Sequence, residues 1–407
     1  MDRARTQPEA VGLSTPGLAR IDEMLSGLIA EGQLPGAAVL VARRGEVVHR
    51  SVQGLKNLAR GEPLALDTIY AIFSMTKPVT AVAMMILYDE GRWQPDDPIA
   101  RHLPEFTDVR VLGGVAPHHA PTMRELMIHT AGFGYGVGLG PHDETDQALV
   151  DAGIWQAADL VEFAGRVAAV PLAYQPGEKL RYSLSMDLQG AIIERLSGQT
   201  LPDFMRTRIF QPLGMIDTDF YVPRDKLGRL ATLYHMYGVT ELTVLDHPAW
   251  RRDGLAIPAL PSGGGGLYST LDDYARFAEM LLGRGALGGV RVISDAAARL
   301  MMSNHLSGAL LVSGFVAGVH RFRPGYGYGF NSAVFYDPAL AGSPVGRGTY
   351  QWDGASGVWF WVDPENEIVF VGMIQRMLQE GMAPLQAMTQ ALVAEACLEP
   401  GGRRLKS

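Results

Sequence analysis

The pattern of apolar positions predicts helices and strands whose character changes along the chain. Residues 16–31 repeat apolar side chains at the spacing of one helical face, which predicts an amphipathic helix. The segment GAAVLVARRGEVVHRSVQG places two β-rich runs around Arg44-Gly45, which predicts a hairpin. Residues 70–91, YAIFSMTKPVTAVAMMILYDEG, are apolar on nearly every side and predict a buried helix with a polar start.

The rest of the chain has a helical middle and a strand-rich end. From about residue 90 to 270, short helical stretches such as 159–170 and 188–198 alternate with loops rich in Gly, Pro and His, without a convincing run of strands. Four β-rich segments follow, and PENE at 364–367 predicts a tight turn between the last two. These segments are GFNSAVFYD, GTYQW, GVWFWVD and EIVFVGMIQ, and the apolar-faced helix APLQAMTQALVAEACL closes the chain.

This order predicts an α+β fold, in which one antiparallel sheet is built from both ends of the chain and covered by the terminal helices. We expect one catalytic domain over residues 10–398. Its α/β part covers about 10–85 and 275–398, and its mostly helical part covers about 86–274. Residues 399–407 are expected to form a flexible tail.

Composition narrows the classes of function. With 47% hydrophobic and 19% charged residues, the 407-residue chain is globular rather than disordered. Its net charge of −8 argues against nucleic-acid binding and against anionic membranes. The single cysteine, Cys397, excludes an intramolecular disulfide and a cysteine-based metal site. No signal-peptide pattern or membrane-spanning apolar run occurs, so we expect a cytoplasmic protein, and a homo-oligomer is left open.

Candidate chemistry begins at the polar start of the helix predicted at 70–91. Ser74 and Lys77 share a helical face, so the ammonium can reach the hydroxyl. Pro78 is tolerated only in a first turn, which places both residues at the helix N-terminus, where backbone N–H groups favour negative charge. Burial of this helix would lower the pKa of Lys77 and make it a usable base. A serine cap beside a snorkelling lysine is the alternative interpretation.

Two later stretches are further candidates. Tyr182 follows a Pro-Gly turn just before a helix and can lie over a cleft, although a packing tyrosine is the commoner interpretation. The small residues 354–357 precede a strong strand and allow a ligand to approach its edge, or else mark a bulge. No metal or other cofactor is expected, because loop histidines are usually solvated. The histidines considered are His102, His118, His119 and His142.

At these positions the sequence resembles the serine β-lactamase and penicillin-binding superfamily. A Ser-x-x-Lys helix, a central tyrosine motif and a late glycine-containing strand occur in that order. LMIHTAGFGYG at 126–136 is similar to the superfamily's Leu-x-x-His-Thr-Ser-Gly segment, and LPSGGGGLYSTLDDYARFAEMLL and GYGYGF extend the resemblance over nearly the whole chain. Within the superfamily the sequence looks most like the family VIII carboxylesterases, relatives of class C β-lactamases. The resemblance implies a β-lactamase/transpeptidase-like fold.

The resemblance also implies roles for individual residues. Ser74 matches the nucleophile, Lys77 its partner and Tyr182 the general base. The backbone N–H groups of Ser74 and Ala355 match an oxyanion hole, whose two donors hold developing negative charge. His129 lies in the matching histidine segment and is expected to orient a loop beside the site.

The sequence departs from the β-lactamases where they bind their substrates. It has Trp352-Asp353-Gly354 in place of Lys-Thr-Gly, and Tyr182-Ser183-Leu184 in place of the class C motif Tyr-x-Asn. A carboxylate-bearing substrate would lose a charge-assisted hydrogen bond worth roughly 1.5–3 kcal/mol. Trp352 is expected to face the cleft, while Phe133 and Tyr135 either wall the acyl pocket or pack within their loop.

The sequence therefore predicts a serine hydrolase that cleaves short-chain carboxylic esters, small neutral molecules, through an acyl-enzyme, with weak β-lactam hydrolysis compatible with the same groups. Acyl transfer to an alcohol is the nearest alternative, followed by a β-lactamase or D-amino-acid peptidase. An inactive homologue that binds peptidoglycan or a peptide is the alternative from another class. An α/β-hydrolase is disfavoured, because GASGV at 354–358 misses the Gly-x-Ser-x-Gly motif at its last position.

Overall fold

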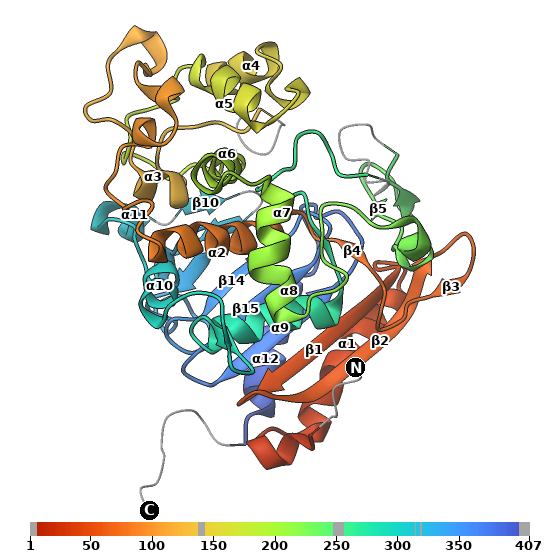
Figure 1. Cartoon of the computed structure of the whole chain (residues 1–407). Coiled ribbons are helices and arrows are strands. Elements are labelled where there is room, and N and C mark those ends of the chain that lie inside the picture. The colour runs from red at the N-terminus through yellow and green to blue at the C-terminus, as the bar shows by residue number, and fades with distance from the viewer. Residues whose placement is uncertain (1–5, 137–142, 247–255, 314, 318–319, 399–407) are drawn as a thin grey trace, which may run out of the picture.

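A large antiparallel sheet with helices on both faces lies beside a mostly helical region (Figure 1), which confirms the predicted α+β class. The computed structural model describes residues 6–136, 143–246, 256–313, 315–317 and 320–398, so the expected tail at 399–407 lies outside the described residues. The helices are α1 Thr15–Ala30, α2 Thr76–Asp89, α3 Met123–Met127, α4 Glu144–Asp151, α5 Leu160–Ala168, α6 Ser185–Ser197, α7 Leu201–Met205, α8 Gln211–Leu213, α9 Leu271–Leu282, α10 Asp295–Met301, α11 Gly308–Ser313 and α12 Leu385–Ala396.

The sheet is built from the two ends of the chain. Within the described residues its strand order is β12-β13-β14-β15-β16-β1-β2-β3, with antiparallel neighbours throughout. The last strand, β16, lies beside the first, β1, with Ala38 opposite Met373. This confirms the prediction that both ends of the chain contribute strands to one sheet. The strands are β1 Gly36–Arg43, β2 Glu46–Asn57, β3 Glu62–Pro63, β12 Tyr326–Tyr328, β13 Ala333–Phe335, β14 Tyr350–Asp353, β15 Trp359–Asp363 and β16 Ile368–Met373.

Two tight turns connect the central strands where the sequence predicts them. Arg44 and Gly45 join β1 to β2 with φ angles of 54° and 80°, and such paired left-handed residues suit a two-residue hairpin turn. The turn at 364–367 joins β15 to β16 and ends at Glu367, whose φ is 57°. Both turns bring their flanking strands directly into antiparallel pairing.

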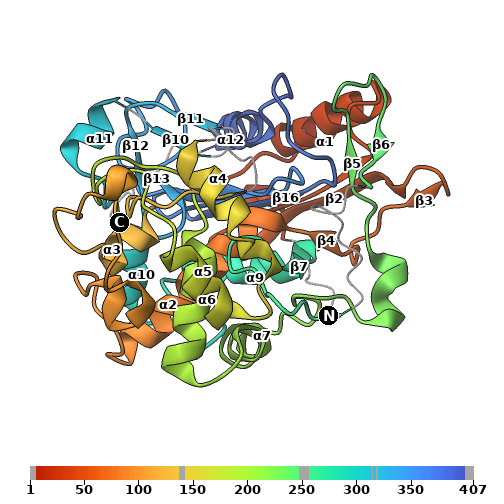
Figure 2. The same ribbon diagram turned by 90° about the horizontal axis from the view of Figure 1, so that it is seen from above.

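Alternate side chains of the sheet contribute to two separate cores. On one face, Trp359 and Trp361 of β15 pack with apolar residues of α1 and α12. On the other face, Phe360 of the same strand packs with α2 and α9. The period of two along the strand thus places the terminal helices on one side of the sheet (Figure 2) and the buried helix α2 on the other.

The middle of the chain packs around α2. Helix α6 contacts α2 directly, and α5 and α7 pack against α6. Strand β4 leads into the start of α2 and pairs with β7, which precedes α9. None of the described helices is long and apolar enough to cross a membrane. The remaining short strands are β4 Tyr70–Ala71, β5 Tyr234–His235, β6 Thr243–Val244, β7 Tyr268–Ser269, β8 Ala286–Leu287, β9 Val290–Arg291, β10 Phe315–Ala317 and β11 His320–Phe322.

Candidate active site

Ser74 lies on a short 3₁₀ turn, η2 (Phe73–Met75), between β4 and α2. Phe73 directly precedes it with a φ of 42°, a left-handed conformation that strains a residue with a bulky side chain. Helix α2 begins at Thr76, and Pro78 occupies its first turn, where the missing N–H breaks no helical hydrogen bond. The turn therefore presents the Ser74 hydroxyl at the N-terminal end of α2, as the sequence predicts.

Side chains from distant parts of the chain meet at the Ser74 hydroxyl. Lys77 Nζ lies 3.0 Å from Ser74 Oγ, and the Tyr182 hydroxyl lies 2.7 Å from the same oxygen. Lys77 is fully buried, and its Nζ also donates to the carbonyl of Gly264 at 2.6 Å. Because Nζ lies 4.6 Å from the centre of the Tyr182 ring, the amine, the phenol and the serine hydroxyl form one compact cluster.

Burial shifts the pKa values of Lys77 and Tyr182 in opposite directions. It lowers the pKa of Lys77 to about 7, against smaller rises caused by the charges of Asp187 and Asp353. It raises the pKa of the Tyr182 phenol well above its usual value, because the phenolate is the charged form. Near neutral pH, Lys77 can be an uncharged amine while Tyr182 keeps its proton. Lys77 is thus the better proton acceptor of the two.

The turn between β14 and β15 lies against the turn that carries Ser74. A Cβ on Gly354 would come within 2.3 Å of the Ile72 carbonyl oxygen, so the approach requires glycine. The close approach predicted at Gly354 is therefore made to the backbone ahead of Ser74. Among the described residues, no backbone carbonyl accepts from the N–H of Ser74 or of Ala355, which leaves both donors available to a substrate oxygen.

A row of stacked aromatic rings passes beside Ser74. Tyr182 stacks on Tyr135 with ring centres 5.5 Å apart, and its ring lies 5.9 Å from that of Trp352. The row continues from Tyr135 to Trp155 and from Trp352 to Phe322, each at 6.1 Å. Trp155 and Phe322 were not predicted from the sequence, because they come from segments that no motif connects to Ser74. We refer to these five residues as the aromatic row.

The two other expected substrate-binding side chains have different surroundings. Phe133 is buried and makes an edge-to-face contact with Phe106, with ring centres 5.7 Å apart, which is core packing. Asp353 ends β14 and is partly exposed. Its charge raises the pKa of both Lys77 and Tyr182, although burial has the larger effect on each, so Asp353 lies close enough to act on the cluster.

His129 holds the segment around Tyr182 in place. Its Nδ1 accepts from the Ser183 N–H at 3.2 Å, and its carbonyl accepts from the Arg181 N–H at 2.9 Å. Both neighbours of Tyr182 are therefore bonded to one residue, whose ring lies 4.8 Å from the Tyr182 ring. Burial lowers the pKa of His129 well below its usual value, so the ring is neutral. These contacts give His129 the loop-orienting role that the sequence predicts.

The other histidines have ordinary partners. His102 lies 3.1 Å from an Asp97 oxygen, and His119 lies 2.8 Å from a Glu125 oxygen. His142 lies outside the described residues. In the part of the chain that the structure describes, no group of three or more His, Cys, Asp or Glu residues is placed to hold a metal ion.

Comparisons with known proteins show which family the chain belongs to. Residues 21–395 match the beta-lactamase family. The chain belongs to this family. Esterase EstB of Burkholderia gladioli is 34% identical over 386 residues, which cover 89% of this chain and 92% of the relative. Protein Rv1367c of Mycobacterium tuberculosis is 36% identical over 359 residues, which cover 84% and 86% of the two chains.

Solved structures extend the comparison. The structure of EstCE1, described as a hydrolase with promiscuous acyltransferase activity, has a TM-score of 0.79 and 28% identity, covering 93% of this chain and 99% of its own. Simvastatin synthase LovD from Aspergillus terreus has a TM-score of 0.76 at 20% identity, covering 93% and 97%, and supports the fold alone. The predicted fold and the resemblance to family VIII carboxylesterases are confirmed, and the chain is a serine hydrolase.

Several buried polar residues around Lys77 were not predicted from the sequence. Asn331 donates to the Lys77 carbonyl at 3.0 Å and exchanges hydrogen bonds with Gln189 of α6, at 2.7 and 3.0 Å. Asp187, also on α6, is 1% exposed and acts on Lys77 through its charge. The sequence did contain one indication of Asp187 and Gln189, because both are polar residues in the first two turns of a helix that is otherwise largely apolar there.

Proposed function

We propose that this protein is a carboxylesterase that cleaves neutral, short-chain esters through an acyl-enzyme on Ser74. The observation that carries the proposal is the position of Ser74 Oγ, within hydrogen-bonding distance of both Lys77 Nζ and the Tyr182 hydroxyl. A serine hydroxyl is a weak nucleophile until a base removes its proton. The pair supplies a base and an acid at one oxygen, which acyl transfer requires.

In the proposed mechanism Lys77 is the base of the first step. As an amine it accepts the Ser74 proton while the serine oxygen bonds to the acyl carbon, and the N–H groups of Ser74 and Ala355 hold the oxyanion. Tyr182 then protonates the leaving alkoxide as the ester C–O bond breaks, and it regains a proton from Lys77. Water resolves the acyl-enzyme by the same transfers in reverse. The resemblance gives the base role to Tyr182, but the opposite pKa shifts favour Lys77.

The surroundings of Ser74 support a neutral substrate. The charge of Asp353 acts on the cluster, so a substrate carboxylate placed there would meet a like charge. The aromatic row offers apolar surface beside the nucleophile, and each ring in it is already packed against its neighbour. A small apolar acyl group therefore fits this site better than a charged peptide or β-lactam.

Acyl transfer to an alcohol is a second candidate function. It is favoured by the likeness to EstCE1, a hydrolase described as having promiscuous acyltransferase activity. Hydrolysis and transfer share the same acyl-enzyme and differ only in whether water or an alcohol attacks it. A β-lactamase or peptidase activity is less favoured, because Trp352 and Asp353 occupy the place of a carboxylate-binding motif.

The first test replaces the nucleophile. Ser74→Ala should lower turnover of p-nitrophenyl acetate to near the uncatalysed rate, because the variant lacks the hydroxyl that forms the acyl-enzyme. Turnover is followed by nitrophenolate release, and circular dichroism verifies that the variant is folded. A fluorophosphonate probe should label the wild type and not the variant. Activity retained in Ser74→Ala, or no labelling of the wild type, would contradict the proposal.

A product assay separates the two candidate reactions. The wild type is given an acyl-length series of nitrophenyl esters with and without excess alcohol, and the acid and the new ester are quantified by chromatography. We expect mainly free acid in water-rich buffer, with faster turnover of short acyl chains. Transfer product as the main species in that buffer would replace esterase with acyltransferase. Nitrocefin, assayed in parallel, measures β-lactam hydrolysis.

A further inference from the structure

Asp187 is a buried carboxylate that the mechanism above does not use. It lies in the first turn of α6 and is 1% exposed. Its Oδ1 accepts from Ser262 Oγ at 2.5 Å and from the Gly264 N–H at 3.2 Å. Its Oδ2 is also buried and meets no hydrogen-bond donor among the described residues. A buried carboxylate with an unpartnered oxygen is unfavourable for stability, which suggests a role other than holding the fold together.

Gly264 connects this carboxylate to the active-site amine. Its N–H donates to Asp187, and its carbonyl accepts from Lys77 Nζ at 2.6 Å, so one residue bridges the two buried side chains. Gly264 belongs to the segment 262–267, SGGGGL, which we call the glycine turn. A shift of Asp187 would therefore move the carbonyl that holds Lys77 beside Ser74.

The glycine turn is wedged between α2 and α6. Thr80 of α2 donates to the Gly263 carbonyl at 2.7 Å. A Cβ on Gly263 would lie 2.3 Å from the Met186 carbonyl oxygen, and one on Gly264 would lie 2.8 Å from Asp187 Oδ2. These distances are shorter than any ordinary carbon contact, so the glycines allow the turn to reach both helices. The position of the Gly264 carbonyl is thus set from both sides.

Asp187 is also one of two carboxylates whose charge raises the pKa of Lys77. Burial raises the pKa of Asp187 itself, while the hydrogen bonds from Ser262 and Gly264 and the charge of Lys77 oppose that rise. The charges of Asp187 on α6 and Asp353 on β14 act on the amine, which lies over the rings of Tyr135 and Tyr182. The neutral ring of His129 is near enough for Lys77 to influence its pKa. Burial lowers the pKa of Lys77, and Asp187 is the stronger of the two anions that raise it again.

Resting on the proposed role of Lys77 as the base, we propose that Asp187 is a positioning residue for this amine. Through Gly264 it holds a carbonyl against Nζ, and its negative charge keeps the buried amine able to bind and release a proton near neutral pH. Asp187 needs no contact with the ester or with Ser74 to act in this way. Its effect is read in the pH profile as well as in the rate.

The test compares the pH dependence of kcat/KM for p-nitrophenyl acetate among variants of the full chain. Asp187→Asn keeps an oxygen that can accept from Ser262 and Gly264 but removes the charge. Loss of the anion lowers the pKa of Lys77. The acid limb of the profile, where kcat/KM rises as Lys77 loses its proton, should therefore move to lower pH by about one unit or more. Asp187→Ala also releases the glycine turn, and its rate on the alkaline plateau should fall at least tenfold further.

Asp273 provides a matched control. It is likewise a buried first-turn carboxylate that accepts from one backbone N–H and one hydroxyl, but those donors belong to Asp217 and Thr218. Asp273→Asn should leave the acid limb in place. A limb that stays fixed in Asp187→Asn, or that moves equally in both variants, would overturn the proposal. Lower stability and rate without a shift of the limb would show a merely structural role and overturn it too.

Two further measurements keep the test decisive. If Asp187→Asn does not fold, Thr80→Val is used instead, because it loosens the glycine turn while keeping every charge. This variant should lower the plateau value of kcat/KM without moving the acid limb of the pH profile. An unchanged plateau would overturn the positioning role. The pH dependence of fluorophosphonate labelling reads Ser74 reactivity without any ester. Labelling without ester turnover would refute the esterase, and a shift of the labelling profile in Asp187→Asn would still support the role of Asp187.

Discussion

Lys77 and Tyr182 show how one physical effect creates an acid and a base at the same oxygen. Both side chains are buried beside Ser74, and both lie within 3.0 Å of its hydroxyl. Desolvation penalises the charged form of each, which is the protonated amine in one case and the deprotonated phenol in the other. The pair is thereby separated into a proton acceptor and a proton donor, as an acid–base pair in an active site must be.

The role of the Tyr182 hydroxyl can be tested by removing its single oxygen atom. Tyr182→Phe should lower kcat for p-nitrophenyl acetate by about 10²–10⁴, the usual contribution of a positioned acid–base group. Tyr70→Phe is the control, because Tyr70 is also buried but, among the described residues, its hydroxyl makes no hydrogen bond to Ser74 or Lys77. The control should stay within about threefold of the wild type. A loss below tenfold in Tyr182→Phe would remove this hydroxyl from proton transfer.

The sequence predicts part of this site from local geometry alone. The contact between Ser74 and Lys77 follows from their spacing at the start of a helix. Tyr182 lies 108 positions from Ser74, so it could be assigned only through the family resemblance. Asp187 and Trp155 could not be assigned, since their contribution depends on how α6 and the loop before α5 approach the cluster. That approach is a tertiary property, and the polar residues at the start of α6 indicate at most that this helix has polar partners, not that Lys77 is one of them.

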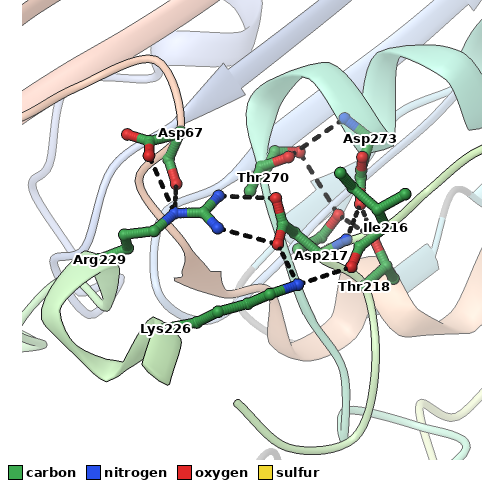
Figure 3. Close-up of polar contacts among 9 residues, drawn as sticks. Asp67, Ile216, Asp217, Thr218, Lys226, Arg229, Thr270 and Asp273 are labelled. Atoms are coloured by element: carbon green, nitrogen blue, oxygen red, sulfur yellow. Dashed lines mark hydrogen bonds and ion pairs between the residues drawn. The ribbon is translucent and has the colours of Figure 1, made fainter. Parts of the chain in front are cut away.

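At the scale of elements, a polar network fixes the loop ahead of η8 (Arg224–Arg229), as Figure 3 shows. Asp217 accepts from both terminal nitrogens of Arg229, at 2.9 and 2.6 Å, and from Lys226 at 2.7 Å. Arg229 also pairs with Asp67 at 3.0 Å, in the loop before β4. A bidentate pair with partners on both sides is worth more than isolated surface ion pairs, because its geometry is already fixed.

Asp273 anchors the same loop to the start of α9. It accepts from the Asp217 N–H at 2.7 Å and from the Thr218 hydroxyl at 2.9 Å (Figure 3). Burial raises the pKa of Asp273 to about 6, and these two hydrogen bonds only partly oppose the rise. The folded state therefore holds a proton on Asp273 at pH values where the unfolded chain has released it.

This raised pKa predicts how stability changes with pH. The contribution of Asp273 is complete below about pH 4 and is lost as the pH rises through about 6, an effect of about 3 kcal/mol in the free energy of unfolding. Asp273→Asn should gain stability relative to the wild type across this window. Urea unfolding of both proteins at several pH values measures the difference. A difference that stays constant from pH 4 to 6 would contradict the assigned cause.

At the scale of the whole molecule, the sheet brings the two ends of the chain together. Strand β1 pairs with β16, the Ser14 N–H donates to the Ala396 carbonyl at 2.8 Å, and the Leu398 N–H donates to Gly12 at 3.0 Å. The alternating and apolar patterns predicted the strands and the shared sheet. They could not predict that β1 inserts beside β16, because strand order depends on packing between segments rather than on any one of them.

The nearness of the two ends predicts that the chain tolerates circular permutation. The native ends are joined through residues 399–407 and 1–5, and new ends are opened between Gly288 and Gly289, which are exposed in the turn between β8 and β9. The permutant should fold and keep ester turnover within about tenfold of the native chain. Far-ultraviolet circular dichroism and nitrophenolate release measure both properties. An insoluble or unfolded permutant would contradict the prediction.

The pairing of β1 with β16 also sets the order in which a ribosome can complete this protein. The β1–β2 hairpin emerges early, but the backbone groups on the other edge of β1 have no strand to bind until the last part of the chain is made. Even the Arg44 N–H, in the turn just after β1, has as its acceptor the carbonyl of Glu367, 323 positions later. An open apolar edge is a template for association with other chains. Nascent or prematurely terminated chains would therefore be the forms of this protein that most need a chaperone.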